Sequence, residues 1–100
     1  MEKKDLDWAN LSFAYMPKDY SYACNYKDGA WEEGGLTPDH TVTLSECSGI
    51  LHYCQECFEG LKAYTTQSGD IVCFRPDLNA ERMYDTAERL CMPPFPKDKF

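Results

Sequence analysis

The sequence has no long apolar run and few basic residues, and both absences exclude classes of protein. A transmembrane helix needs roughly 20 consecutive apolar residues, and no stretch of the 100-residue chain approaches that length. The 10 Lys and Arg are outnumbered by 17 Asp and Glu, so the net charge is −7 and a basic nucleic-acid-binding surface is not expected. The charged start MEKKDLDW is not followed by an apolar stretch, so we expect no secretory signal and a cytoplasmic location.

Histidine is scarce as well, which restricts the metal sites that can be expected. His40 stands alone, and His52 lies too close to the Cys54-x-x-Cys57 pair to be its usual zinc-binding partner. The 6 cysteines would suit a disulfide framework in a secreted protein, but cytosolic thiols stay reduced. We therefore predict no metal and no disulfide, and interpret the cysteines as small buried apolar residues. A Cys-x-x-Cys metal module is the alternative.

What the chain does contain is enough apolar and aromatic residues for one small folded domain. Hydrophobic residues make up 43% of it and aromatic residues 14%, which is typical of a globular chain rather than a disordered one. Residues 1–19 are interpreted as an extended polar lead-in broken at Pro17. Residues 20–100 are interpreted as the domain itself.

Local patterns predict several short strands. Alternating and β-branched residues indicate strands over residues 20–26, 30–31, 41–44, 61–65 and 71–74. Lys27-Asp28-Gly29 predicts a tight turn between the first two strands, and residues 67–70 predict a hairpin connection between the last two. A loop is expected around Gly34, Gly35 and Pro38.

Helical spacing predicts a short amphipathic helix over residues 48–58 and a longer helix that begins at Pro76. Asp77 or Asn79 is expected to cap the longer helix, and Pro93-Pro94 is expected to stop it. Its predicted inward stripe consists of Ala80, Met83, Tyr84, Ala87, Leu90 and Cys91. The final residues FPKDKF look like the start of a further helix. Strands with segregated helices predict an α+β fold.

The sequence of the segment from His52 to Met83 resembles that of a known family. It reads HYCQECFEGLKAY and, after a Gly-Asp turn, VCFRPDLNAERM, and the match extends through DWANLSFAYMP, YKDGAWEEG, VTLSE and ERLCMP. In this order the motifs resemble the N-terminal domain of branched-chain amino acid aminotransferases, which are fold-type-IV (class-IV) pyridoxal-phosphate enzymes. FEGLKAY favours this group over D-amino acid aminotransferases and aminodeoxychorismate lyases, which are related alternatives.

The resemblance implies a small domain with a mostly antiparallel sheet, helices packed on it, and a homodimer in the full-length family. It also implies transfer of the amino group of leucine, isoleucine or valine to 2-oxoglutarate through pyridoxal 5'-phosphate. In that family the imine lysine belongs to a second domain that this sequence lacks. We therefore expect no catalytic residue here and a truncated chain that is inactive alone. A non-catalytic remnant or dimer-interaction module is the alternative.

The resemblance also assigns roles to three side chains. Arg82, in Asn79-x-x-Arg82-Met83, would bind the cofactor phosphate, although a helix arginine could instead pair with a nearby acid such as Asp85 or Glu81. Tyr53 and Phe58 would line the pocket for an aliphatic substrate side chain; the alternative is that they belong to the core.

Other residues of the motifs are interpreted as structural. Arg75 is expected to hold a turn through carbonyl oxygens, and Glu59 to anchor backbone donors. Lys62 is basic in the family but is not the imine lysine. Cys47 and Cys54 stand where the family sequence has glycine. If those glycines have special backbone angles, cysteine there is expected to cost stability or to shift the loop.

Overall fold

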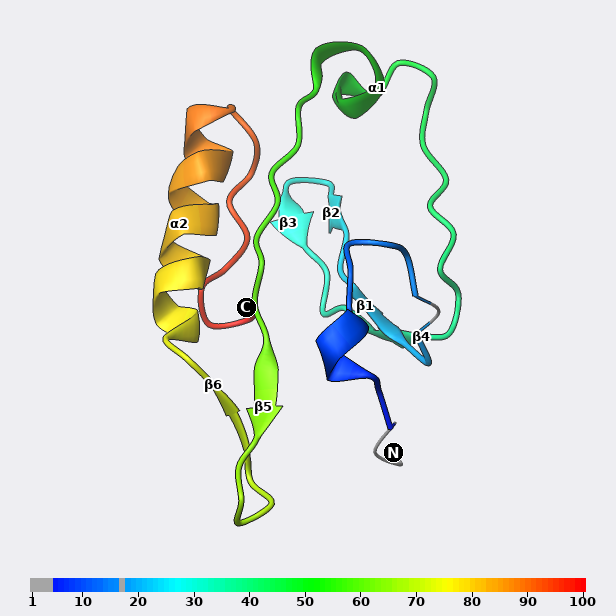
Figure 1. The fold of residues 1–100 in the computed structure, drawn as a ribbon. Helices are drawn as coiled ribbons and strands as arrows, with labels where there is room; N and C mark the ends of the chain where they lie inside the picture. The colour runs from blue at the N-terminus through cyan, green and yellow to red at the C-terminus, as the bar shows by residue number, and fades with distance from the viewer. Residues whose placement is uncertain (1–4, 17) are drawn as a thin grey trace.

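The computed structural model describes residues 5–16 and 18–100 and shows short elements joined by long connections (Figure 1). The predicted break at Pro17 and the first four residues of the lead-in lie outside the described residues. In chain order the elements are a 3₁₀ turn Trp8–Asn10, β1 Ser21–Ala23, β2 Tyr26–Lys27, β3 Ala30–Trp31, β4 Gly35–Thr37, α1 Gly49–Tyr53, β5 Ala63–Thr65, β6 Ile71–Cys73 and α2 Pro76–Arg89.

The strands pair two by two. β1 pairs antiparallel with β4, β2 with β3, and β5 with β6. Together with the two helices, these antiparallel pairs confirm the predicted α+β class. Over the described residues the pairs remain three separate ribbons and do not join into one sheet.

The turn between β2 and β3 follows from its sequence. Asp28 and Gly29 both have positive φ, at 51° and 83°, as the two central residues of a tight type I′ hairpin require. The strand predicted over residues 20–26 is instead interrupted at Cys24-Asn25. There the Cys24 thiol donates to the Glu32 carbonyl, and the Glu32 amide donates to the Asn25 carbonyl.

The strand predicted over residues 41–44 is wrong, and β4 at Gly35–Thr37 pairs with β1 in its place. Both the amide and the hydroxyl of Thr41 donate to Asp39 Oδ1, at 2.9 and 2.7 Å. Local side-chain bonds of this kind satisfy groups that a strand would offer to a neighbour. Gly35, which was predicted to lie in a loop, is the first residue of β4.

The first helix is shorter than predicted. α1 ends at Tyr53 because Cys54 adopts a left-handed conformation, φ 51° and ψ 36°. Left-handed residues terminate helices and favour glycine. Cys54 therefore has the left-handed backbone that favours glycine, although its side chain is cysteine.

The second helix begins at Pro76 as predicted, but its capping differs. Arg75 occupies the N-cap position with φ 47° and no side-chain cap. Asp77 and Asn79 do not cap the helix because their side chains bind Arg75 and Glu59 respectively. The predicted cap was wrong because both candidates have other partners.

α2 ends before the proline pair is reached. The Met92 amide donates to the Ala87 carbonyl at 2.9 Å and the Cys91 amide to the Glu88 carbonyl at 3.0 Å. With φ 55° at Cys91, this is the Schellman arrangement, which satisfies the last carbonyls of a helix. A second left-handed position is therefore filled by cysteine.

Little of the described chain is fully buried. Only Ala80 and Ala87, both on α2, fall in that class, while Met83 and Tyr84 are half-buried and the last two members of the predicted stripe are exposed. The cysteines are not the buried residues that were predicted, since each is half-buried or exposed. The radius of gyration is 16.0 Å, against about 13 Å for a compact chain of this length.

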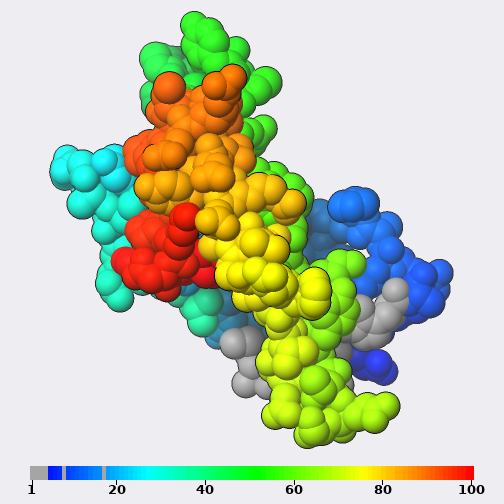
Figure 2. All heavy atoms as spheres, turned by 90° about the vertical axis from the view of Figure 1, so that its left-hand side faces the viewer, coloured from blue at the N-terminus to red at the C-terminus, as the bar shows by residue number. Residues whose placement is uncertain are grey.

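The residues after α2 return along it and connect it to the first hairpin. In Figures 1 and 2 the segment from residue 90 to 100 runs beside α2. Trp31 Nε1 donates to the Pro94 carbonyl at 2.8 Å, and its ring meets Phe95 edge-on at 5.0 Å. Residues 97–99 form a turn, so the helix expected at FPKDKF is not present.

Candidate functional site

A charged cluster forms where the segment after α1 meets the first turns of α2. Arg82 donates from Nε to Glu59 Oε1 at 2.5 Å and from Nη2 to Glu59 Oε2 at 2.7 Å. Asn79, one helical turn earlier, donates from Nδ2 to Glu59 Oε2 at 2.8 Å and to the Gly60 carbonyl at 3.0 Å. The spacing of three residues places Asn79 and Arg82 on one helix face, so a single carboxylate binds both.

The two members of the ion pair differ sharply in exposure. The Glu59 side chain is 7% exposed and the Arg82 side chain 69%. Hydrogen bonds from Arg82 and Asn79 lower the pKa of Glu59 to about 2, and the bond to Glu59 raises the pKa of Arg82. Both groups are therefore charged at neutral pH, and the cationic end faces solvent.

This cluster corrects two expectations. Arg82 pairs with Glu59, 23 residues away in sequence, and not with Asp85 or Glu81. Glu59 chiefly binds side-chain donors, where backbone donors were expected. The signal for this cluster in the sequence is weak. It consists of Glu59 before a glycine and of an Asn79-x-x-Arg82 pair on a later helix.

The donor set of Arg82 fits a phosphate. A guanidinium has five N–H donors in a planar fork, and Glu59 takes those on the inner edge, at Nε and Nη2. Among residues 5–16 and 18–100 no partner binds the outer edge, formed by Nη1 and the second N–H of Nη2, and this edge could bind an anion. Arginine suits phosphate because this fork matches two of its oxygens.

Arg75 has a different partner from the one expected. Its Nε and Nη2 bind the Asp77 carboxylate, the closest contact being 2.7 Å, whereas carbonyl oxygens were predicted. The bond lowers the pKa of Asp77 and raises that of Arg75. Because both side chains are more than half exposed, the pair is a local surface contact at the start of α2.

Tyr53 and Phe58 lie at the end of α1 and in the segment that follows it. Tyr53 is the last residue of the helix and Phe58 follows in the extended segment, and their exposed fractions are 85% and 86%. Neither is part of a core within this chain. Lys62, also exposed, lies just before β5.

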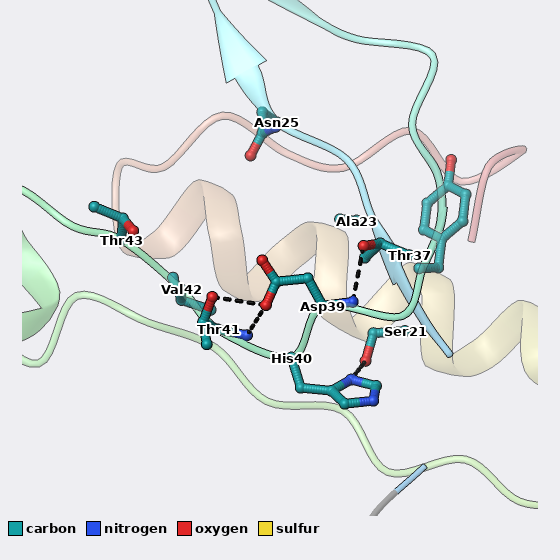
Figure 3. A pocket seen from close by; sticks show the side chains of 10 residues that line it. Ser21, Ala23, Asn25, Thr37, Asp39, His40, Thr41, Val42 and Thr43 are labelled. Atoms are coloured by element: carbon teal, nitrogen blue, oxygen red, sulfur yellow. Dashed lines mark hydrogen bonds between the residues drawn. The ribbon is translucent and has the colours of Figure 1, made fainter. Parts of the chain in front are cut away.

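A hollow of about 450 Å³ with a mixed polar and apolar lining lies beside β1 and β4 (Figure 3). His40 Nε2 lies 2.9 Å from the Lys18 carbonyl and therefore donates to it, so His40 Nδ1 accepts from the Ser21 hydroxyl at 3.0 Å. Hydrogen bonds from Thr41 lower the pKa of Asp39. These polar groups satisfy one another, which accounts for the turn after β4.

A second, mostly apolar hollow of about 350 Å³ lies near the C-terminal segment. Its lining consists of Tyr22, Cys24, Trp31, Met83, Phe95, Lys99 and Phe100. None of the predicted site residues lines either hollow.

Residues 5–16 and 18–100 contain neither a cluster of metal-binding side chains nor a membrane-spanning helix. No group of three or more His, Cys, Asp or Glu side chains is arranged to hold a metal ion. No helix there has both the length and the apolar content to cross a membrane.

Comparison with known proteins supplies close relatives. The chain is 55% identical over 97 residues to a branched-chain-amino-acid aminotransferase of Haemophilus influenzae, a match that covers 97% of the chain and 28% of the relative. It is 45% identical to the protein of that name from Helicobacter pylori, again over 97% of the chain and 28% of the relative. A chloroplastic branched-chain amino acid aminotransferase of Humulus lupulus is 44% identical over 100% of the chain and 25% of the relative.

No protein-family model matches the chain. The chain spans about a quarter of the length of these curated relatives. Over almost its entire length it therefore matches the N-terminal part of the branched-chain-amino-acid aminotransferases, and the family resemblance read from its motifs is confirmed.

Proposed function

We propose that these residues form the cofactor-phosphate side of a pyridoxal-phosphate-dependent branched-chain aminotransferase. The reaction would move the amino group of leucine, isoleucine or valine to 2-oxoglutarate. The observation that supports this most directly is the Arg82 guanidinium, which Glu59 fixes on its inner edge and which is 69% exposed, with no other partner in the described part of the chain.

The cofactor, when bound, stabilises the carbanion of the amino-acid substrate, and this chain would bind and orient. Arg82 would hold the phosphate. Tyr53 and Phe58, whose rings are largely exposed here, would offer apolar surface to an aliphatic substrate side chain; burying such a side chain contributes about 1.5–3 kcal/mol.

The remaining parts of the proposal concern the whole protein. Residues 20–100 would form the small domain, the imine lysine would come from a second domain, and the full protein would be a homodimer in the cytoplasm. Some plant relatives are named chloroplastic or mitochondrial, so location differs among similar proteins. A D-amino acid aminotransferase or aminodeoxychorismate lyase specificity is a less favoured reading.

A non-catalytic interaction module is the second candidate. It is favoured by the large apolar side chains left exposed, including Phe13, Val42 and Phe74, since wide apolar surfaces mark contacts with other protein surfaces. A measurement of cofactor binding distinguishes the two functions, because only the aminotransferase function requires Arg82 to hold a phosphate.

The test places residues 1–100 in the Haemophilus influenzae relative, in exchange for the segment they match. We expect Arg82→Ala to weaken pyridoxal 5'-phosphate binding roughly ten- to a hundredfold, as loss of a charge-assisted hydrogen bond does. Arg75→Ala is the matched control, since it also removes a guanidinium from an ion pair at the start of α2. Weakening by Arg75→Ala with no change in Arg82→Ala would show that the wrong arginine was chosen.

A further inference from the structure

We propose that Glu59 is a positioning residue that holds the Arg82 guanidinium ready for the cofactor phosphate. The proposal rests on the function proposed above. It assigns a role to a side chain that would not itself touch phosphate, and that sequence analysis interpreted as an anchor for backbone donors.

The geometry of the pair gives Glu59 this role. Arg82 is 69% exposed, and Glu59 is the partner that fixes its guanidinium within the described part of the chain. Two bonds from one planar group to one carboxylate set both the position and the plane of the guanidinium. The edge left over then points away from Glu59, which is the direction from which an anion can approach.

Glu59 is itself held in place. Its side chain is 7% exposed, and Asn79 donates to the same oxygen, Oε2, that accepts from Arg82 Nη2. Asn79 also donates to the Gly60 carbonyl, which ties the carboxylate to its own backbone. Asn79 and Arg82, both on α2, bind the same carboxylate, so the exposed guanidinium is held by a side chain that is almost covered.

A carboxylate near a phosphate also repels it, so two effects of Glu59 oppose each other. The repulsion acts across the guanidinium, at a position where Arg82 is largely in water, and water and salt screen charges of that kind. Orientation is not screened: without Glu59 the long arginine side chain must be ordered by the phosphate itself, at a cost in conformational entropy. We therefore expect the positioning effect to exceed the repulsion.

The experiment uses the same exchange protein and two ligands, pyridoxal 5'-phosphate and pyridoxal, which lacks the phosphate. Glu59→Ala should weaken pyridoxal 5'-phosphate binding by about three- to tenfold and leave pyridoxal binding unchanged. In the double variant Glu59→Ala, Arg82→Ala, binding should be no weaker than in Arg82→Ala alone, because Glu59 acts through Arg82. Glu59→Gln, which keeps the size of the side chain, replaces Glu59→Ala if the latter does not fold.

The outcomes separate the two proposals. Equally weakened binding of both ligands in Glu59→Ala would mean a general structural role for Glu59. Tighter binding of pyridoxal 5'-phosphate would mean that repulsion dominates. Either result overturns the positioning role of Glu59 but leaves the phosphate role of Arg82 in place. If Arg82→Ala leaves the ratio of the two affinities unchanged, the phosphate role of Arg82 fails, and the role of Glu59 fails with it.

Discussion

At the scale of single residues, two arginines in one stretch of sequence differ in what holds them. Arg75 pairs with an aspartate two residues away, and both side chains are exposed; such surface pairs contribute little to stability. Arg82 pairs with a carboxylate that is almost covered and lies on another segment. The second pair therefore links the segment after α1 to α2, and the titration of Glu59 reports whether the pair has formed.

The pKa of the Glu59 carboxyl should lie well below that of an ordinary glutamate. Its pKa is lowered from 4.5 to about 2 by the bonds from Arg82 and Asn79. Because the folded-state pKa is the lower one, the pair stabilises the fold above the unfolded-state value, and this contribution is lost as pH falls from about 5 towards 2. The measurement is the pH dependence of the Glu59 side-chain carboxyl resonance by NMR.

Arg82→Ala provides the internal check on that titration. Removing the main donor should raise the pKa of Glu59 towards its ordinary value, while Arg75→Ala should leave it unchanged because Arg75 binds Asp77. A Glu59 midpoint near 4.5 in the unaltered chain would contradict the ion pair described here.

The cysteine pair gives a second prediction at this scale. Cys54 and Cys57 have no second ligand pair at zinc spacing in the sequence, and a structural zinc site needs four ligands. Elemental analysis of protein purified without added metal should therefore find no stoichiometric zinc. One equivalent of zinc that disappears in the Cys54→Ser, Cys57→Ser variant would contradict the prediction.

At the scale of elements, two glycines with positive φ differ in their surroundings. Gly29, in the β2–β3 turn, has φ 83° and open space where a Cβ would stand. Gly34, before β4, has φ 77°, and a Cβ there would lie 2.8 Å from Cys24 Cβ and against the Tyr22 hydroxyl. The second position therefore needs glycine for both conformation and space.

Gly29→Ala should lower the free energy of unfolding by about 1–2 kcal/mol, the cost of a left-handed non-glycine residue. Gly34→Ala should cost roughly 1–3 kcal/mol more, because the methyl group displaces Tyr22 from its bond to the Glu33 carbonyl. Chemical denaturation followed by circular dichroism measures both. Gly35→Ala is the control and should change stability by less than about 0.5 kcal/mol, since a Cβ at Gly35 meets nothing within 4 Å. Equal losses of stability in Gly29→Ala and Gly34→Ala would refute the steric argument.

The elements that sequence predicted well are those set by local chemistry. Asp28-Gly29 fixes its own turn, and Pro76 begins α2, because in both cases the backbone preference of the residue decides. The failures have a local cause too. Thr41 binds Asp39, and this leaves no strand over residues 41–44.

The candidate site shows the other limit of sequence reasoning. Arg82 was found through a motif, but its partner was not, because the Glu59–Arg82 contact crosses 23 residues. No periodicity relates a residue in an extended segment to one in a later helix. For the same reason Asn79 was predicted as a helix cap, although its side chain is taken by Glu59.

At the scale of the whole molecule, the described chain is elongated, with extents of 45 × 27 × 25 Å. α1 and the β5–β6 hairpin lie at opposite ends of the long axis (Figure 2). Large apolar side chains remain exposed along it, among them Phe13, Phe58 and Phe74. The chain on its own is therefore expected to bind an apolar fluorescent dye strongly, as partly covered folds do. Absence of dye binding, with the sedimentation behaviour of a compact monomer, would contradict the described shape.

The chain on its own is also expected to lack transaminase activity, because the resemblance places the imine lysine in a second domain. The assay combines the chain with pyridoxal 5'-phosphate, leucine and 2-oxoglutarate and measures glutamate. Sustained turnover that Lys62→Ala abolishes would make Lys62 the imine residue and reject the assignment. The exchange protein, which contains the rest of the Haemophilus influenzae relative, is the positive control.

The contact between Trp31 and Pro94 has a consequence for the order of folding. It joins residues 63 apart, while the β2–β3 hairpin and α2 each form from neighbouring residues. Closing so long a loop is entropically costly and slow compared with forming a hairpin or a helix. During synthesis from the N-terminus, the Trp31 ring must therefore stay without its cover until Pro94 and Phe95 have left the ribosome. The indole should then be open to solvent or to a chaperone until that point of synthesis is reached.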